Sequence, residues 1–414
     1  MIEKIVPQFS ELSEKLTKKL KTNIKKKEGI FFTPYNIIKK SIDLVIEYCT
    51  ENNIIIIDVL EPSCGSCEFI KYINNIYTNI NIDGIEYNDD IYNEIEKINF
   101  GNNNSVEIIN EDYLEYDKNN EMKYDLIIGN PPYFVIPKKD IDIKYDTIYD
   151  GRPNIYLIFI MNSLLKLNKN GILLFILPKS FCNCLWYNKL RVIINNNYKI
   201  VNIVECYDDK YIDTEQDTII LMLQNCKSNN SEFIYKKNEI ILFNTKDNIN
   251  NIKKLYKKSK TLNELNFEVS IGKLDWTTNI NKSKLTTDNN KSRVIYDSDI
   301  VNKKLCITEF KNPQKKNYID KKGENTPIII VNRGYGNGKY KFKYCIVNID
   351  KEYVLENHII KIEYKNKIDK EILLKKFKKI IDSFDNPKTL EFINIYCCNN
   401  ALNGQELQYI LPIY

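Results

Sequence analysis

The sequence lacks long apolar runs, and its 414 residues include only one histidine, His358. The stretch Gly171–Pro178 is far shorter than the roughly 18 apolar residues that a membrane-spanning helix requires. The first residues, Met1–Pro7, contain no apolar segment followed by a small-residue cleavage site, so they do not resemble a signal peptide. The single histidine excludes a zinc site built on several histidines. We therefore expect a soluble intracellular protein without a membrane partner or a bound metal.

Disulfide bonds are not expected either. The 11 cysteines are an odd number and lie scattered among apolar residues, which is typical of thiols in a reducing compartment. Cys64 and Cys67 form a Cys-x-x-Cys pair, and Cys182 and Cys184 follow later in the chain. Four thiolates can hold a zinc ion. Because Cys64 lies in a loop with a different predicted use, we interpret all four as buried free thiols.

Charge is divided unevenly along the chain. Residues 251–414 carry 31 Lys and Arg against 19 Asp and Glu, a net of +12, whereas residues 1–250 have a net of −7. A basic half is typical of a protein that binds a polyanion, although a solvated lysine-rich surface gives the same count. Residues 1–27 are basic as well, and an apolar residue recurs there every fourth position, at Leu12, Leu16, Leu20 and Ile24. This spacing predicts one amphipathic helix that packs on the body of the protein.

The first half of the chain shows alternating strand and helix patterns. Apolar runs predict buried strands at Ile54–Leu60, Ile80–Glu86, Val106–Asn110, Tyr124–Gly129, Gly171–Leu177, Ile200–Cys206 and Thr218–Gln224. Helical spacing predicts helices at Cys67–Tyr77, Ile91–Ile98, Ile155–Leu167 (closed by Asn170-Gly171) and Tyr187–Asn195. The alternation implies a doubly wound α/β sheet, whose ligand lies beyond the carboxyl ends of the strands.

Three of these strand ends carry residues suited to a small ligand. After the first strand, Glu61–Phe69 is rich in small residues that let the backbone approach a ligand in front of a helix N-terminus. Glu86, after the second strand, stands where an acid can bind the two hydroxyls of a ribose. Asp112 and Tyr113, after the third, can accept from an exocyclic amine and cover a purine face. Taken alone, each acid is more often a helix N-cap or a solvated turn.

The fourth strand end gives the most specific signal. Asn130-Pro131-Pro132-Tyr133 is a rigid extended segment, because the two prolines prevent it from relaxing into a helix. We expect it to direct the Asn130 side-chain oxygen and the Pro131 carbonyl outward, where two acceptors suit a substrate –NH2 group. Tyr133 offers a flat ring on which a substrate can stack. The alternative is a proline-stiffened strand exit with no function.

These segments resemble the gamma group of type II DNA N6-adenine methyltransferases. Asn130–Tyr133 resembles the catalytic motif of that family, Leu60–Gly65 its first motif, Gly29–Tyr35 its N-terminal motif and Asn154–Lys179 the stretch after the catalytic motif. The motif order, with the recognition region last, is that of the gamma group, and the likeness covers roughly residues 28–225. The family often has a glycine at the position of Cys67, and we expect the thiol to narrow the pocket slightly.

The resemblance implies S-adenosylmethionine as the cofactor and a flipped-out adenine as the substrate. The implied catalytic residues are Asn130, Pro131, Pro132, Tyr133 and Tyr211. The first two would accept the hydrogens of the adenine amine, the two tyrosines would form stacking walls, and Tyr207 is the rival of Tyr211. The implied cofactor-binding residues are Thr33, Glu61, Pro62, Ser63, Gly65, Glu86, Tyr87, Asp112, Tyr113 and Asn130. Cytosine-C5 methylation is excluded, because those enzymes need a Pro-Cys nucleophile and the chain has no such dipeptide.

The second half contains the candidate nucleic-acid contacts. Residues 226–260 are predicted to be a linker that contains short strands. After this linker, Val269–Lys273 and Trp276 resemble the start of the family's recognition domain. A helix is predicted at Lys370–Lys379. Val331–Tyr344 interleaves basic, aromatic and glycine residues, and its predicted DNA contacts are Arg333, Tyr335, Lys339, Lys341 and Lys343. A hairpin with Gly-Asn-Gly as its turn is the structural alternative, and both interpretations can hold together.

The sequence thus predicts two α/β domains after a basic helix at residues 1–27. Residues 28–245 are expected to form a Rossmann-like S-adenosylmethionine-dependent methyltransferase domain with a seven-stranded mixed sheet. Residues 246–414 are expected to form a mixed α/β target-recognition domain. The predicted activity is methylation of adenine N6 in duplex DNA by a monomer in the cytoplasm or nucleoid. The alternatives are methylation of RNA adenine, methylation of a protein glutamine amide, and a non-catalytic DNA-binding subunit.

Overall fold

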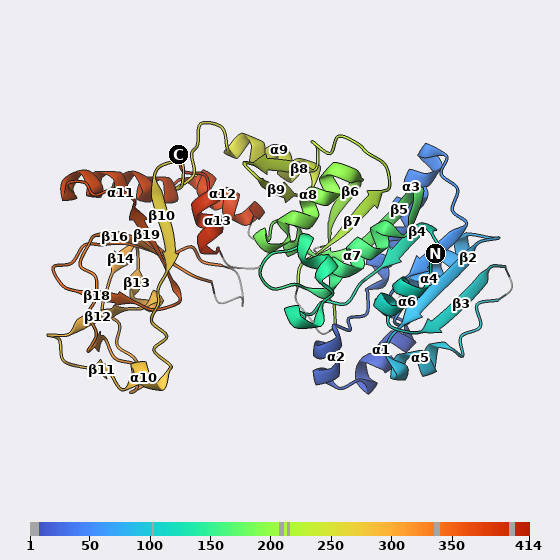
Figure 1. Ribbon diagram of the computed structural model, residues 1–414, viewed down its shortest axis with the longest axis horizontal. Helices are drawn as coiled ribbons and strands as arrows, with labels where there is room; N and C mark the ends of the chain where they lie inside the picture. The colour runs from blue at the N-terminus through green and yellow to red at the C-terminus, as the bar shows by residue number, and fades with distance from the viewer. Residues whose placement is uncertain (1–7, 102, 207–210, 213–215, 335–339, 397–401) are drawn as a thin grey trace, which may run out of the picture. The chain divides into compact units, whose positions relative to one another are not determined.

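The computed structural model describes residues 8–414 except for residues 102, 207–210, 213–215, 335–339 and 397–401. The chain divides into two compact units, residues 1–250 and residues 251–414 (Figure 1). Among the described residues, no helix combines the length and the apolar character that crossing a membrane would require.

A seven-stranded sheet forms the centre of the first unit (Figure 1). Its strands are β1 (Asp58–Glu61), β2 (Asn81–Glu86), β3 (Ser105–Asn110), β4 (Tyr124–Gly129), β5 (Leu167–Pro178), β6 (Lys199–Cys206) and β7 (Thr218–Gln224). They lie in the order β3-β2-β1-β4-β5-β7-β6, and β7 runs antiparallel to both of its neighbours while the other pairs are parallel. The predicted Rossmann-like mixed sheet is confirmed.

Helices cover both faces of this sheet. Helices α3 (Tyr35–Asn52), α4 (Glu68–Ile76) and α5 (Asp89–Ile95) pack on one face, and α6 (Tyr113–Asn119), α7 (Ile155–Leu165) and α8 (Asn188–Asn197) pack on the other. Successive strand side chains point to opposite faces, so Leu173 and Phe175 of β5 join one core while Ile172 and Leu174 join the other. Burial on both faces explains why these strands are continuous apolar runs.

Several predicted boundaries in this unit are wrong. The first strand begins at Asp58 rather than Ile54, because Ile55 and Ile57 are 78% and 50% exposed and do not belong to the buried run. The helix that begins at Ile155 ends at Leu165 rather than Leu167, and the next strand begins at Leu167 rather than Gly171. The chain leaves the helix there because Leu167 already pairs with Tyr124 at the start of β5.

The basic N-terminal segment forms two helices instead of the one predicted. Helix α1 (Glu11–Lys19) is followed by Leu20, whose backbone is extended, and α2 (Thr22–Glu28) begins two residues later. Lys25 of α2 is buried and donates to the Thr17 carbonyl near the end of α1, 3.0 Å away. Leu16 of α1 and Leu20 at the break are buried in the core on the α3 side of the sheet.

The predicted linker contains more structure than the sequence indicated. It holds the hairpin of β8 (Ile234–Lys237) and β9 (Ile240–Phe243), and then α9 (Lys246–Leu255), a helix that was not predicted. Short 3-10 turns occur in the first unit at Lys138–Asp140, Ile143–Thr147, Lys179–Cys182 and Leu185–Tyr187, and in the second at Asp297–Asp299.

The second unit is built on two small sheets. One is antiparallel, in the order β10 (Phe267–Ile271), β19 (Ile359–Tyr364), β16 (Ile328–Asn332) and β17 (Tyr344–Val347). The other has the order β11 (Leu285–Thr286), β15 (Tyr318–Ile319), β12 (Ser292–Ile295) and β18 (Tyr353–Leu355). A hairpin joins β13 (Ile300–Val301) to β14 (Lys304–Leu305). The helices are α10 (Asn279–Lys282), α11 (Lys370–Phe384), α12 (Pro387–Tyr396) and α13 (Gly404–Tyr409), and α11 extends five residues beyond the predicted end.

Candidate active site

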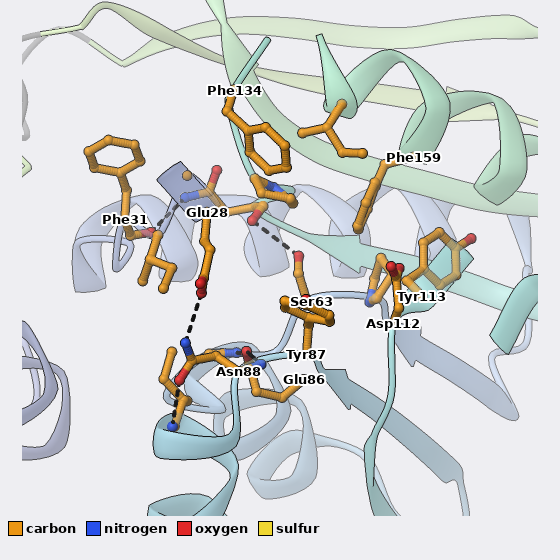
Figure 2. A pocket seen from close by; sticks show the side chains of 18 of the residues that line it. Glu28, Phe31, Ser63, Glu86, Tyr87, Asn88, Asp112, Tyr113, Phe134 and Phe159 are labelled. Atoms are coloured by element: carbon orange, nitrogen blue, oxygen red, sulfur yellow. Dashed lines mark hydrogen bonds between the residues drawn. The ribbon is translucent and has the colours of Figure 1, made fainter. Parts of the chain in front are cut away.

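Two adjoining cavities lie where strands β1, β2 and β4 end, and Figure 2 shows the side chains that line the larger one. The larger has a volume of about 310 Å³, the smaller one of about 40 Å³, and both are lined by Phe31, Phe32, Ser63, Gly65 and Asn130. The predicted cofactor residues that line the larger cavity are Pro62, Ser63, Gly65, Glu86, Tyr87, Asp112, Tyr113 and Asn130. The remaining two, Thr33 and Glu61, line the smaller cavity. The fold therefore brings together side chains that are up to 97 residues apart in sequence.

The loop after β1 contributes a buried carboxyl group to the smaller cavity. Glu61 is 3% exposed, and its Oε2 has no hydrogen-bond partner among the described residues. Burial raises the pKa of Glu61 well above its usual range. A buried acceptor without a donor is costly, so this oxygen is suited to a cationic or hydrogen-bonding ligand group.

Glu86 ties the ends of β1 and β2 together. Its Oε2 accepts from the Gly65 amide at 2.9 Å, and its Oε1 accepts from the Asn88 amide at 2.8 Å. Burial raises the pKa of this carboxyl from 4.5 to about 7, and the two backbone donors oppose the shift. Each carboxylate oxygen can still accept a second hydrogen bond from a ligand hydroxyl.

Asp112 and Tyr113 differ from the predicted arrangement. Asp112 is the N-cap of α6 and accepts from the Leu114 amide at 2.9 Å, so the N-cap interpretation holds for one of its oxygens. Tyr113 is buried, and its hydroxyl shares a hydrogen bond with Ser163 at 3.0 Å, away from the cavity (Figure 2). The ring packs against Phe159, which lines the cavity itself, with centroids 4.9 Å apart.

Several cavity residues were not predicted as site residues. Phe134 and Phe159 point into the larger cavity and offer flat apolar walls (Figure 2). Glu28 accepts from Asn88 Nδ2 at 2.8 Å across the opening. Phe134 could have been found, because it directly follows Asn130–Tyr133. The Glu28–Asn88 pair could not, since nothing in the local sequence links two polar residues 60 positions apart.

Gly29 lets the N-terminal segment cross closely over the catalytic loop. It ends α2 with φ +66°, a conformation that favours glycine. A Cβ at this position would lie 2.5 Å from the Tyr133 amide nitrogen. The segment that follows therefore reaches the Asn130 side chain.

The amide of Asn130 is oriented by that segment. Its Nδ2 donates to the Phe31 carbonyl and to Thr33 Oγ1, each at 3.1 Å. Both partners accept hydrogens here, so the nitrogen faces the N-terminal segment and Oδ1 faces the opposite way. Thr33, predicted as a cofactor contact, thus has a second role as a contact of Asn130.

The predicted outward acceptor is satisfied within the protein. Asn130 Oδ1 accepts from the Tyr133 hydroxyl, which also lies 2.7 Å from the Ile176 carbonyl. The Tyr133 ring stacks on Phe31 at a centroid distance of 6.4 Å and meets Tyr156 edge-on at 5.9 Å. In this structure, therefore, the Asn130 acceptor and the Tyr133 ring both have partners within the protein, because a partly buried acceptor takes the nearest donor.

Tyr211, the second stacking candidate, lines neither cavity. It is 7% exposed, and its hydroxyl is close enough to contribute to the raised pKa of Tyr133, which burial dominates. The rival Tyr207 lies outside the described residues.

An ion pair lies at the ends of β5 and β6. Lys179 and Glu205 form it at a distance of 2.8 Å, and both side chains are largely buried.

The cysteines do not form a metal centre in the part of the chain that the structure describes. The nine cysteines there are free thiols, and no group of three or more His, Cys, Asp and Glu side chains is placed to hold a metal ion. Cys67 is fully buried at the N-cap of α4 with φ +60° and lines neither cavity, so the predicted narrowing is wrong. The left-handed backbone explains why glycine suits this position.

Helix α1 supports the loop after β1. The Ser13 and Ser66 hydroxyls share a buried hydrogen bond of 2.8 Å, and Ser10 Oγ donates to Glu68 Oε1 at 2.6 Å. Lys15 and Lys19 pair with Glu94 of α5 at 2.7 and 3.1 Å, and they lower the pKa of that carboxyl to about 2. The N-terminal helix thus contacts the elements that follow both β1 and β2.

The predicted DNA contacts lie at one end of the sheet in the second unit. Asn332, buried at the end of β16, donates to the Lys341 carbonyl at 3.0 Å and accepts from the Lys343 amide at 2.7 Å. Arg333 follows directly, and Arg333, Lys341 and Lys343 are exposed. Strands β16 and β17 pair antiparallel, as the structural alternative requires, but the Gly-Asn-Gly predicted as its turn lies outside the described residues. Tyr335 and Lys339 lie outside the described residues.

The cavities fit the predicted cofactor, S-adenosylmethionine, which carries a sulfonium and an ammonium group. Four acidic side chains line the larger cavity, namely Glu28, Glu86, Glu111 and Asp112, against one basic residue, Lys27. Glu61 adds to the smaller cavity a carboxyl group whose Oε2 has no hydrogen-bond partner among the described residues. Glu86 would hold the ribose, Glu61 the methionine end, and Asp112 with the aromatic walls the adenine.

The amino-acid sequence is similar to those of known methylases. Residues 36–212 match the family model of the Eco57I restriction-modification methylase. The chain is 25% identical to the type II methyltransferase M.CvrRI of Paramecium bursaria Chlorella virus XZ-6E over 98% of this chain and 99% of that protein. It is 33% identical to the modification methylase CviBIII of Paramecium bursaria Chlorella virus NC1A over 46% of this chain and 48% of that protein.

A solved structure shares the fold. The DrdV–DNA complex matches 97% of this chain and 57% of that chain, with a TM-score of 0.53 and 14% sequence identity. This likeness concerns the fold, whereas the family match and the two viral relatives show that the chain is similar in sequence to type II methyltransferases and modification methylases.

Proposed function

We propose that this chain, a relative of the type II methyltransferases, transfers a methyl group from S-adenosylmethionine to the N6 amine of an adenine turned out of duplex DNA. The observation that carries the proposal is the placement of Asn130-Pro131-Pro132-Tyr133. This segment leaves the end of β4, and its Asn130 lines both cofactor cavities. An amine held there lies beside the predicted cofactor.

The chain activates the amine by positioning. The adenine amine is a weak nucleophile, because its lone pair is delocalised into the ring. Asn130 Oδ1 and the Pro131 carbonyl accept its two hydrogens and stabilise the positive charge that develops on nitrogen. When bound, S-adenosylmethionine supplies an electrophilic methyl group on a sulfonium sulfur. No histidine is needed as a general base, in keeping with the single His358.

Phe31 and Thr33 hold Asn130 in the orientation that this reaction needs. Because the Phe31 carbonyl and Thr33 Oγ1 take both hydrogens of Nδ2, the amide presents its oxygen to the substrate. If the Asn130 amide were rotated by half a turn, its NH2 group would face the NH2 group of the adenine. Both groups are hydrogen-bond donors, so they would repel each other. This pair therefore acts on the substrate through Asn130.

Tyr133 changes partners when the adenine arrives. Its hydroxyl occupies Asn130 Oδ1 in this structure, so the amine takes that acceptor as the hydroxyl withdraws. Turning an adenine out of the duplex costs a few kcal/mol. Stacking on aromatic rings returns roughly 1–3 kcal/mol per base, and we assign the two walls to Tyr133 and Tyr211.

The second unit supplies the contacts to duplex DNA in this proposal. Its net charge of +12 favours a polyanion, and Arg333, Lys341 and Lys343 lie exposed at one sheet end. We define this group, together with His358, as the recognition edge. One chain carries both the cofactor cavities and the recognition edge, which is consistent with action as a monomer.

The test is transfer of labelled methyl from S-adenosylmethionine to unmethylated duplex DNA, followed by nucleoside analysis. The expected product is N6-methyldeoxyadenosine, and Asn130→Ala should bind the cofactor without forming it. Label at another base position, or label only in RNA or in protein amides, would contradict the proposal. Cofactor binding without transfer to any of these would indicate a non-catalytic subunit.

A further inference from the structure

The only histidine of the chain lies at the recognition edge. His358 occupies the turn between β18 and β19, and its carbonyl accepts from the Arg333 amide at 2.8 Å. Arg333 follows β16, and the Lys343 carbonyl accepts from the neighbouring Asn332 amide at 3.0 Å. His358, Arg333 and Lys343 therefore stand on adjacent strands at the same end of one sheet.

A buried carboxyl group orients the His358 ring. Glu356 Oε1 lies 2.6 Å from His358 Nδ1, and Glu356 Oε2 accepts from the His358 amide at 3.1 Å. The Glu356 side chain is 4% exposed, whereas the His358 side chain is 41% exposed. A carboxylate only accepts hydrogen bonds, so the ring nitrogen that faces it carries hydrogen, and Nε2 lies on the side of the ring away from Glu356.

The turn that carries this pair is fixed against β10. The Gly272 amide donates to the Ile359 carbonyl at 2.8 Å, and the Asn357 amide donates to the Leu274 carbonyl at 3.0 Å. A Cβ on Gly272 would lie 2.1 Å from the Glu356 carbonyl oxygen, so only glycine permits this approach. The backbone position of His358 is therefore determined by packing.

Glu356 makes one more hydrogen bond to His358 than closing the turn requires. The bond from Glu356 to the His358 amide already closes the turn. The second bond places a buried carboxyl group against a ring that is half-exposed, and it fixes the direction of the ring. Carboxyl groups that orient a histidine ring in this way are typical of rings that contact a ligand.

We propose that His358 contacts a base edge of the bound DNA through Nε2 and helps to determine which site is methylated, with Glu356 as its positioning residue. This inference rests on the proposed DNA methyltransferase activity. Lysines at the recognition edge contact phosphates, which carry no sequence information, whereas an oriented imidazole can discriminate among base edges.

The test compares site preference rather than total activity. We would measure kcat/KM of the full-length enzyme on its preferred duplex and on duplexes with single base-pair changes. For His358→Ala and His358→Gln we expect discrimination at one base pair to fall about 5- to 100-fold, with cofactor affinity unchanged. Lys365→Gln, at the opposite end of β19, is the matched control and should leave discrimination unchanged.

Glu356→Gln tests the positioning role. It should reduce discrimination at the same base pair as His358→Ala, and the double variant should be no worse than His358→Ala alone. If the losses of discrimination in Glu356→Gln and His358→Ala added together in the double variant, Glu356 would not act by positioning His358. Unchanged discrimination in both His358 variants, or an equal loss on every sequence, would overturn the base contact. Failure of the proposed function itself would be seen separately, as a wild-type enzyme that methylates no DNA.

Discussion

The two units of the chain present opposite charge to their proposed ligands. The cavities of the first unit are lined by carboxyl groups and suit a cationic cofactor, and residues 1–250 have a net charge of −7. The recognition edge belongs to a unit with a net charge of +12 and suits a polyanion. The difference implies that chemistry and DNA affinity can be altered separately, and each of the following experiments tests that separation.

The largest effect is expected for Asn130→Ala in the first unit. Loss of the oriented acceptor should lower the transfer rate about 10²–10³-fold, which is typical of removing one preorganised hydrogen-bonding group. Cofactor and DNA affinity should change little, as measured by calorimetry and by binding of labelled duplex. A variant with wild-type turnover would disprove the site, and a variant without DNA binding would break the division between the units.

Tyr133 should show a smaller effect that depends on the substitution. Tyr133→Ala removes a stacking surface and should reduce kcat/KM about 10- to 100-fold. Tyr133→Phe keeps the ring and removes the hydroxyl that occupies Asn130 Oδ1, so it should stay within a few-fold of wild type. Steady-state kinetics on one duplex measures both. Equal losses in the two variants would assign the role to the hydroxyl instead of the ring.

Glu86 should make cofactor affinity depend on pH. Its pKa is raised by burial from 4.5 to about 7, so the carboxyl is largely neutral at pH 6 and ionised at pH 8. Because the ribose hydroxyls donate to the ionised form, affinity for S-adenosylmethionine should rise with pH across this range, by up to about tenfold per unit. Calorimetry at several pH values measures the profile.

The same pKa shift has the opposite sign for folding. A raised carboxyl pKa means that the folded state binds more protons than the unfolded state. The contribution of Glu86 to stability is therefore complete below pH 4.5 and is lost as pH rises through about 7. Glu86→Gln should flatten both dependences, and melting temperatures provide the folding control. A wild-type affinity that is constant from pH 6 to 8 would exclude Glu86 as a ribose ligand.

The predictability of the two units from sequence also differs. Strands such as β7 (Thr218–Gln224) were predicted residue for residue, because burial on both sheet faces favours a near-continuous apolar run. In the second unit, β11 and β15 are only two residues long, and they pair with each other although they lie far apart in the sequence. Such pairing leaves no periodic signal in the local sequence.

Within the site, the residues were easier to predict than their partners. Glu86 and Asn130 follow strand ends, where a parallel sheet gathers its ligand contacts, so their position in the sequence was informative. The contact that holds the Asn130 amide comes from Phe31, which lies 99 residues away in the sequence. Three-dimensional packing alone decides those contacts, including the left-handed backbone that buries Cys67.

The smallest effect, expected for Lys343→Gln, is the sharpest test of the second unit. Removing one phosphate contact should weaken DNA binding a few-fold and reduce the slope of log affinity against log salt concentration by about 0.9. Lys365→Gln removes the same charge at the other end of the sheet and should leave the slope unchanged. Fluorescence anisotropy across a salt series measures both variants. If both reduce the slope equally, the affinity comes from diffuse positive charge and not from the recognition edge.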